Sequence, residues 1–125
     1  MTISVADSLA RIEADDHRFN CFTSVYRDEA LAAACDLIDG PLAGVPFSVK
    51  DLYDVAGRTT RAGSMIYADN APATSDATAV ARLKAAGAVL VGATNMDEFA
   101  FGFTTENPHN GPTRNPHDPT CSVGG

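Results

Sequence analysis

The sequence predicts an α/β fold in which helices alternate with short apolar strands. Helical apolar spacing occurs in residues 4–16, 27–39 and 77–86. Two short apolar runs, 42–51 and 88–92, have the composition of buried strands. The chain has 125 residues, of which 45% are hydrophobic and 20% charged, as expected for globular protein. Elements in this order favour helices layered on a sheet.

The first predicted helix, residues 4–16, places Val5, Leu9 and Ile12 on one face. Ser4 or Asp7 is suited to cap its start, because short polar side chains accept hydrogen bonds from the first free backbone N–H groups. The helical spacing therefore predicts that the chain begins with an amphipathic helix.

Residues 18–25 alternate loosely between polar and apolar and are compatible with a short strand. The second predicted helix, residues 27–39, ends at the Gly-Pro pair 40–41, which cannot continue a helix. Its predicted apolar face consists of Leu31, Cys35 and Ile38.

The run 42–51 predicts a buried strand that ends at a lysine. The segment 54–64, which contains Gly57 and Gly63, predicts a loop compatible with a short strand, and residues 66–72 predict irregular structure. The helix predicted for 77–86 turns Val80 and Leu83 inward, with Ser75 or Asp76 as its cap.

The strand predicted for 88–92 is followed by a short helix over 95–101. Residues 104–125 are rich in Asn, Pro, Gly and Thr and predict a loop. Such a long irregular tail rarely completes a compact domain, so we expect the chain to stop within a domain.

The formal charge is −7, from 9 Lys and Arg against 16 Asp and Glu. This acidic balance excludes nucleic-acid binding through a basic surface as the main function. No apolar run is long enough to span a membrane, and residues 1–10 do not resemble a secretory signal. We therefore expect a cytoplasmic protein without direct contact to nucleic acid or membrane. The cysteines and histidines follow no metal-ligand spacing, so no metal site is expected: Cys21, Cys35, Cys121, His17, His109 and His117.

Lys50 is one of only two lysines, and it follows the predicted strand at the end where α/β folds place their sites. Burial there would favour the neutral amine, which can accept a proton. Asp51 would favour the charged form if it faced the same side, but adjacent strand residues face opposite sides. The alternative is a solvated lysine paired with Asp51 at the surface, which spacing alone favours.

Asn95, Met96 and Asp97 directly follow the second predicted strand and are candidates for the polar groups of a site. The same residues also suit the start of a helix, where Asn caps and acids oppose the helix dipole. The loop motifs 104–107 and 111–116 are explained equally well by Asx turns and by ligand contacts.

Taken together in order, five motifs resemble the amidase signature family over nearly the whole chain. They are Gly-Pro-Leu-Ala-Gly-Val-Pro-Phe-Ser-Val-Lys-Asp (40–51), Thr-Thr-Arg-Ala-Gly-Ser (59–64), residues 76–88, Thr-Asn-Met-Asp-Glu-Phe-Ala (94–100), and Thr-Glu-Asn (105–107) with residues 111–118. The resemblance implies a mixed central sheet covered by helices on both sides. It also implies that Lys50 is catalytic.

The resemblance implies hydrolysis of amide C–N bonds by a Ser-Ser-Lys triad. In such a triad, a neutral lysine takes a proton through a bridging serine, held by a cis peptide, from the nucleophilic serine, and an acyl-enzyme forms. No cofactor is implied. The expected partner is a small amide substrate, and the expected assembly is a homodimer or a complex with a small accessory subunit.

The chain departs from the family where the Gly-Gly-Ser-Ser-Gly-Gly-Ser run should continue. Gly124 and Gly125 match its first two glycines, and Ser122 matches neither serine. Residues 1–125 therefore resemble the amino-terminal portion of a single amidase domain that ends before the Ser-Ser-Gly-Gly-Ser motif. We expect this fragment to be inactive alone and marginally stable, with open strand edges and uncovered apolar surface.

Within the family, residues 101–107 and 115–118 resemble hydrolases of the carboxybiuret and allophanate type. Residues 95–99 resemble the A subunit of glutamyl-tRNA amidotransferase. Two further hypotheses remain at this stage: a non-catalytic remnant that binds a partner or a small amide, and a plain structural α/β domain in which Lys50 is solvent-facing.

Overall fold

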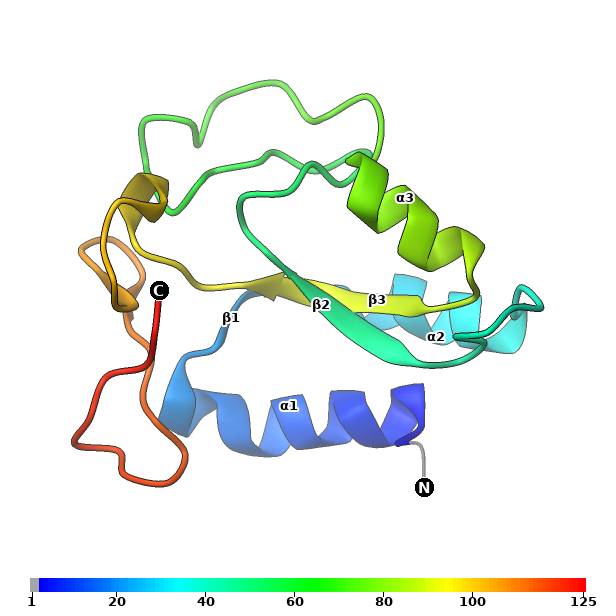
Figure 1. Cartoon of the computed structure of the whole chain (residues 1–125), viewed down its shortest axis with the longest axis horizontal. Coiled ribbons are helices and arrows are strands. Elements are labelled where there is room, and N and C mark those ends of the chain that lie inside the picture. The colour runs from blue at the N-terminus through cyan, green and yellow to red at the C-terminus, as the bar shows by residue number, and fades with distance from the viewer. Residues whose placement is uncertain (1–2) are drawn as a thin grey trace.

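A three-stranded mixed sheet lies at the centre of the protein, seen in a computed structural model that describes residues 3–125 (Figure 1). Its strands are β1 (Phe22–Val25), β2 (Pro46–Lys50) and β3 (Val89–Thr94), in the order β1-β3-β2. The middle strand β3 pairs antiparallel with β1 and parallel with β2. The helices are α1 (Val5–Phe19), α2 (Arg27–Cys35) and α3 (Thr78–Ala85).

The two faces of the sheet carry separate apolar cores because the side chains of Val89, Leu90 and Val91 in β3 alternate between them. One core joins α1 and α2 to the sheet and contains Val5, Leu9, Ala30, Val89 and Val91. The other joins α3 to the sheet and contains Tyr26, Val49, Val55, Val80, Leu90 and Ala93. Helices thus cover both faces, as Figure 1 shows, and the α/β class predicted from the sequence is confirmed.

Helix α1 is confirmed and extends three residues beyond its predicted end. The Ser4 hydroxyl caps it by accepting a hydrogen bond from the backbone N–H of Asp7 at 3.0 Å. Val5 and Leu9 are buried as predicted. The helix ends at Asn20, whose left-handed φ of 55° reverses the chain toward β1.

Helix α2 ends at Cys35 rather than at residue 39, and the predicted buried face was wrong. Ala30 is its one buried residue, and Ala34 is half-buried one turn later. These small side chains let the helix lie close to α1 and β3. The three residues predicted to form the buried face are instead largely exposed: Leu31, Cys35 and Ile38.

The predicted strand 42–51 is extended only from Pro46 to Lys50, since residues 41–44 form turns. Helix α3 is confirmed, with Val80 buried and Leu83 half-buried. Neither predicted residue caps it, because its first flanking residue is Ala77. The Asp76 carboxylate instead accepts the Ala56 N–H and pairs with Lys84 at 2.7 Å.

The prediction of a helix over residues 95–101 was also wrong. Residues 95–97 lack helical structure, and only a short 3₁₀ turn, η1 (Glu98–Ala100), follows. Phe99 and Ala100 have φ values of 56° and 55°, in the left-handed region that an α-helix cannot contain.

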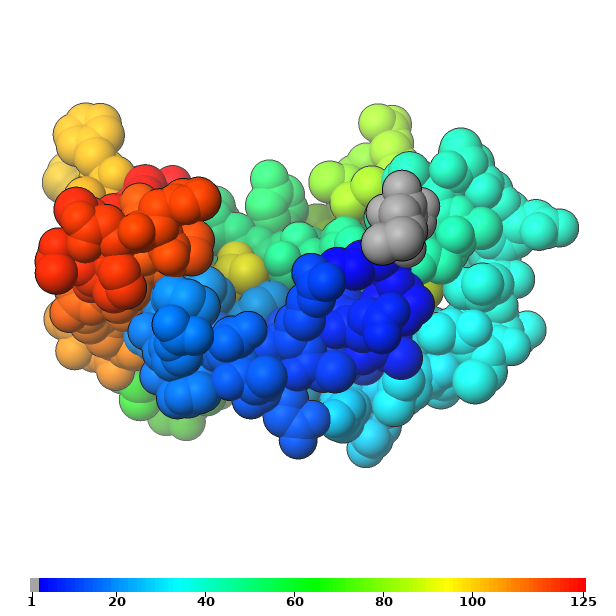
Figure 2. Space-filling model, turned by 90° about the horizontal axis from the view of Figure 1, so that it is seen from below, coloured from blue at the N-terminus to red at the C-terminus, as the bar shows by residue number. Residues whose placement is uncertain are grey.

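Residues 104–125 are mainly irregular, as predicted, but they also contain a short antiparallel pair, β4 (Glu106–Asn107) and β5 (Gly111–Pro112). Isolated bridges join Thr104 to Gly124 and Arg114 to Ser122. Viewed from the α1 side, this orange and red segment forms one end of the molecule, and α2, in cyan, lies toward the other (Figure 2). Across residues 3–125, no helix has the length and apolarity that a membrane crossing requires.

Candidate functional site

Lys50 is the last residue of β2 and lies beside Thr94, the last residue of β3. The strands run parallel, so their carboxyl ends meet at the same edge of the sheet. Lys50 is half-buried, and its ammonium forms no hydrogen bond or ion pair with any residue of the stretch 3–125. The predicted position of the lysine at the end of a strand is therefore confirmed, and a surface pair with Asp51 is not formed within that stretch.

Asp51 turns away into the structure and is only 9% exposed. Burial raises the pKa of its carboxyl group, while the backbone N–H groups of Arg61 and Gly63 and the Arg61 charge act in the opposite direction. The Asp51 carbonyl accepts the Ala62 N–H at 2.9 Å. Through these contacts the residue next to Lys50 holds the loop 61–63 against the end of β2.

Asn95 and Met96 are buried in the segment that follows β3. The Asn95 amide donates hydrogen bonds to the Gly111 carbonyl at 2.9 Å and to the Thr113 hydroxyl at 3.2 Å. Its side-chain oxygen accepts the Met96 N–H at 3.0 Å, and Met96 is 0% exposed. In this structure Asn95 joins the end of β3 to β5, and Met96 contributes packing rather than a surface contact.

Asp97 and the two final glycines lie farther along the same end of the molecule. The Asp97 carboxylate accepts the Glu98 N–H at 3.0 Å and so caps η1. The Gly124 carbonyl accepts the Thr105 hydroxyl at 2.9 Å, and the Gly125 N–H donates to the Phe103 carbonyl at 3.0 Å. Residues 103–105 therefore hold the two glycines at the sheet end toward which β2 and β3 run (Figure 1).

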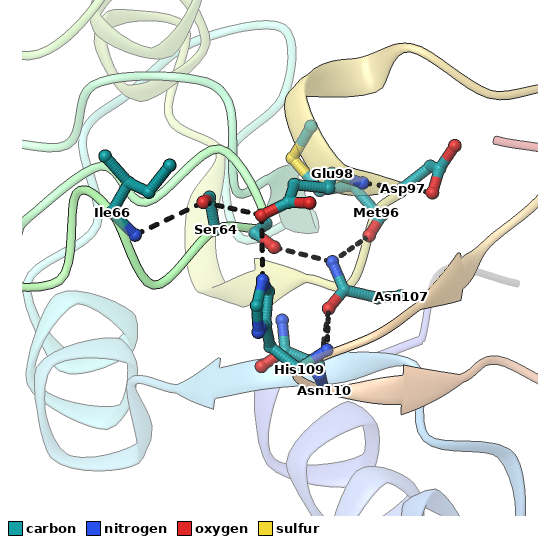
Figure 3. Close-up of polar contacts among 9 residues, drawn as sticks. Ser64, Ile66, Met96, Asp97, Glu98, Asn107, His109 and Asn110 are labelled. Carbon is teal, nitrogen blue, oxygen red and sulfur yellow. Dashed lines mark hydrogen bonds and ion pairs between the residues drawn. The ribbon is translucent and has the colours of Figure 1, made fainter.

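Asn107, which the sequence reasoning treated as part of a turn, connects three segments (Figure 3). Its amide donates to the carbonyl of Gly63 at 2.7 Å and to that of Met96 at 2.8 Å. Its side-chain oxygen accepts the backbone N–H groups of His109 and Asn110. The Asx turn was thus a correct alternative, but the same side chain also fixes two other loops.

Ser64, Glu98 and His109 form a second polar cluster beside Asn107 (Figure 3). The buried Ser64 hydroxyl donates to Glu98 Oε1 at 2.7 Å, and His109 Nε2 lies 2.7 Å from the same oxygen. The Ser64 hydrogen bond, and after it the one with His109, holds the pKa of Glu98 below its usual value. His109, which the spacing suggested was unpaired, therefore has a carboxylate partner.

This cluster lacks the geometry of a hydrolytic triad. The Glu98 oxygen stands between Ser64 and His109, so the imidazole does not receive the hydroxyl proton as a general base must. Nor do residues 3–125 contain three or more His, Cys, Asp or Glu side chains arranged to hold a metal ion. The cluster joins loops rather than activating a nucleophile.

A cavity of about 370 Å³ lies at the opposite end of the sheet, near the start of β3. Its lining includes Leu37 and Ile38 and two cationic side chains that already have partners. These ion pairs are Arg58 with Glu29 and Lys84 with Asp76. The lining also includes Asp36 and Tyr26, but it contains none of the candidate site residues that the sequence singled out, so this cavity is a weaker candidate than the end of β2.

Comparison with known proteins decides the family. The family model described as Amidase matches residues 4–125. The chain belongs to the amidase family.

Two relatives and one solved structure give this assignment detail. The chain is 54% identical over 127 residues to AtzE, a subunit of the 1-carboxybiuret hydrolase of Pseudomonas sp. (strain ADP), covering 95% of the chain and 28% of the relative. It is 47% identical over 125 residues to the A subunit of the glutamyl-tRNA(Gln) amidotransferase of Streptomyces coelicolor, covering 94% of the chain and 25% of the relative.

A chain of a solved structure, described as an unexpected vestigial protein complex that reveals the evolutionary origins of an s-triazine catabolic enzyme, superposes with a TM-score of 0.91 and 50% identity, covering 97% of this chain and 28% of that one. The amidase chain described here therefore spans about a quarter of the length of these relatives.

Proposed function

We propose that this amidase chain contributes the general base, Lys50, to hydrolysis of a small amide of the carboxybiuret type. The main support is the 54% identity to the carboxybiuret hydrolase protein AtzE over the segment that carries Lys50. Its position at the end of β2, with no partner for its ammonium among residues 3–125, is compatible with that role. The activity belongs to a protein that also carries the two triad serines.

The proposed chemistry follows from what a lysine can do. The neutral Lys50 amine accepts the proton of a bridging serine, which in turn takes the proton of the nucleophilic serine. The nucleophile attacks the amide carbonyl, and Lys50 returns the proton through the bridging serine to the leaving nitrogen. The amine then departs, and water hydrolyses the acyl-enzyme. Both serines come from the Ser-Ser-Gly-Gly-Ser motif that the family resemblance places after Gly125. This chain therefore supplies one member of the triad and is inactive alone.

A chimera tests the proposal, with residues 1–125 replacing the matched segment of the Pseudomonas AtzE protein. We expect the chimera to release ammonia from 1-carboxybiuret, and Lys50→Met to lower kcat/KM by about a thousandfold or more, because no base then accepts the serine proton. Lys84→Met is the matched control, since it removes the other lysine and should leave the rate within about twofold.

The isolated 125-residue chain is the second control and should show no turnover. Activity of the Lys50→Met chimera, or turnover by a pure sample of the chain, would contradict the proposal. A chimera that folds and binds substrate without any hydrolysis would instead support a non-catalytic remnant.

A second candidate is a fragment of a glutamyl-tRNA amidotransferase of the same family, supported by the 47% identity to the A subunit of that enzyme. Hydrolysis of glutamine rather than 1-carboxybiuret by a corresponding chimera would favour it. For either candidate we infer a small accessory protein or a second copy as partner, because the similar solved structure is described as a protein complex. A cytoplasmic location fits the three free cysteines.

A further inference from the structure

We propose that Asn107 is a positioning residue for Lys50, acting through the loop 61–63. The inference rests on the proposed function of Lys50. It concerns a residue whose hydrogen bonds reach the neighbourhood of Lys50 only through intervening residues. The contacts that support it connect Asn107 to Lys50 in three steps.

The first step is the Asn107 side chain, which is 3% exposed and uses its full hydrogen-bonding capacity. It holds the carbonyls of Gly63 and Met96 on one side and two backbone N–H groups of residues 109–110 on the other. A buried amide with both donors and its acceptor satisfied fixes all the segments that it joins.

The second step is the close packing of Gly63 against this amide. Gly63 has a φ of 68°, and a Cβ there would lie 2.8 Å from Asn107 Nδ2 and 3.0 Å from Met96 Cγ. The loop can approach Asn107 and Met96 this closely only because residue 63 has no side chain.

The third step runs from the loop to β2. Ala62 donates its N–H to the Asp51 carbonyl at 2.9 Å, and its own carbonyl accepts the Phe99 N–H at 2.8 Å. The Asp51 carboxylate also receives the Arg61 N–H at 3.5 Å. The loop 61–63 is therefore hydrogen-bonded to Asn107 at Gly63, and to Asp51, the residue next to Lys50, at Arg61 and Ala62. Since small errors in the placement of a base cost large factors in rate, this connection is expected to affect catalysis.

The test has one arm on the chain itself and one on the chimera. In the 125-residue chain we expect the Ala62 amide to be protected from hydrogen exchange, and Asn107→Ala to accelerate its exchange by roughly tenfold to hundredfold, because two buried carbonyls lose their donor. Asn70→Ala is the matched control, since Asn70 is exposed and its side chain forms no hydrogen bond within residues 3–125.

In the chimera, Asn107→Asp keeps the acceptor for residues 109–110 but replaces the donor with a carboxylate. We expect kcat to fall by about tenfold or more with KM within about twofold. A purely structural role would lower stability without lowering kcat of the folded chimera at unchanged KM. Gly63→Ala reaches the same contact from the other side and should reproduce the loss of kcat.

Three results would overturn the inference: rapid Ala62 exchange in the unmodified chain, unchanged exchange in Asn107→Ala, or an unchanged kcat in a folded Asn107→Asp chimera. If the variants do not fold, the rate of hydrogen exchange of the Ala62 amide in the unmodified chain decides whether the inference stands. Failure of the proposed function is separate, because it shows as an inactive parent chimera or as an active Lys50→Met chimera.

Discussion

The Glu98 carboxylate receives hydrogen bonds from Ser64 and His109 on a single oxygen. These bonds favour its charged form, so the pKa of Glu98 in the folded chain is below the ordinary value of 4.5. An acid whose pKa is lowered by folding stabilises the folded state above its unfolded pKa. That contribution is lost as the pH falls through the lower, folded pKa.

We therefore predict that Glu98→Gln lowers the melting temperature at pH 7 and has a smaller effect in acid below the lowered pKa of Glu98, where Glu98 in the unmodified chain is also neutral. Differential scanning calorimetry at both pH values measures this. The matched control is Glu106→Gln, since Glu106 is exposed and its side chain has no hydrogen bond within residues 3–125. An equal loss for Glu98→Gln at both pH values would show that the charge is not responsible.

At the level of elements, the sequence predicted which segments are regular better than which faces are buried. The prediction for α1 was correct in its position and in its buried face, because the apolar residues of this helix are large and evenly spaced. The buried face predicted for α2 was wrong because alanine contributes little to an apolar pattern, although Ala30 is 1% exposed and packs in the core with residues of α1 and β3. The helix expected over 95–101 did not form because Asn95 is bound to β5 and Met96 to Asn107.

Two leucine-to-alanine substitutions test which faces of α1 and α2 are buried. Leu9→Ala in α1 should reduce the free energy of unfolding by about 2–5 kcal/mol, because Leu9 is 2% exposed and its removal leaves a cavity. Leu31→Ala in α2 should change it by only about 0.5 kcal/mol, because Leu31 is 37% exposed. Urea unfolding followed by circular dichroism gives both values. A large loss for Leu31→Ala would restore the face predicted from the sequence.

At the scale of the whole molecule, large apolar side chains gather in the loops that follow the carboxyl ends of β2 and β3. The most exposed are Met65 at 56%, Ile66 at 74%, Phe101 at 94% and Phe103 at 96%. Part of the loop that contains the two phenylalanines, in gold, projects from the body of the molecule (Figure 2). Apolar surface of this kind marks a contact region or an aggregation hazard.

We predict that the 125-residue chain self-associates and that replacing Phe101 and Phe103 together with serine weakens the association. Exposed aromatic rings gain free energy when they leave water, and serine removes that gain. Sedimentation velocity over a hundredfold range of concentration measures the effect. Leu37→Ser is the control, because Leu37 is 47% exposed but lies near the opposite end of the sheet. A monomeric unmodified chain with a sharp, cooperative thermal transition would contradict the prediction.

The sequence by itself determined the α/β class, the amidase resemblance and the place of Lys50 at the end of a strand, because these depend on local apolar patterns and contiguous motifs. Tertiary structure alone decided how Ser64, Glu98, Asn107 and His109 meet. The physical reason is distance along the chain: Asn107 and Gly63 are joined by one buried hydrogen bond across 44 positions. No local propensity encodes such a contact, which forms only when the sheet brings the loops at its carboxyl end together.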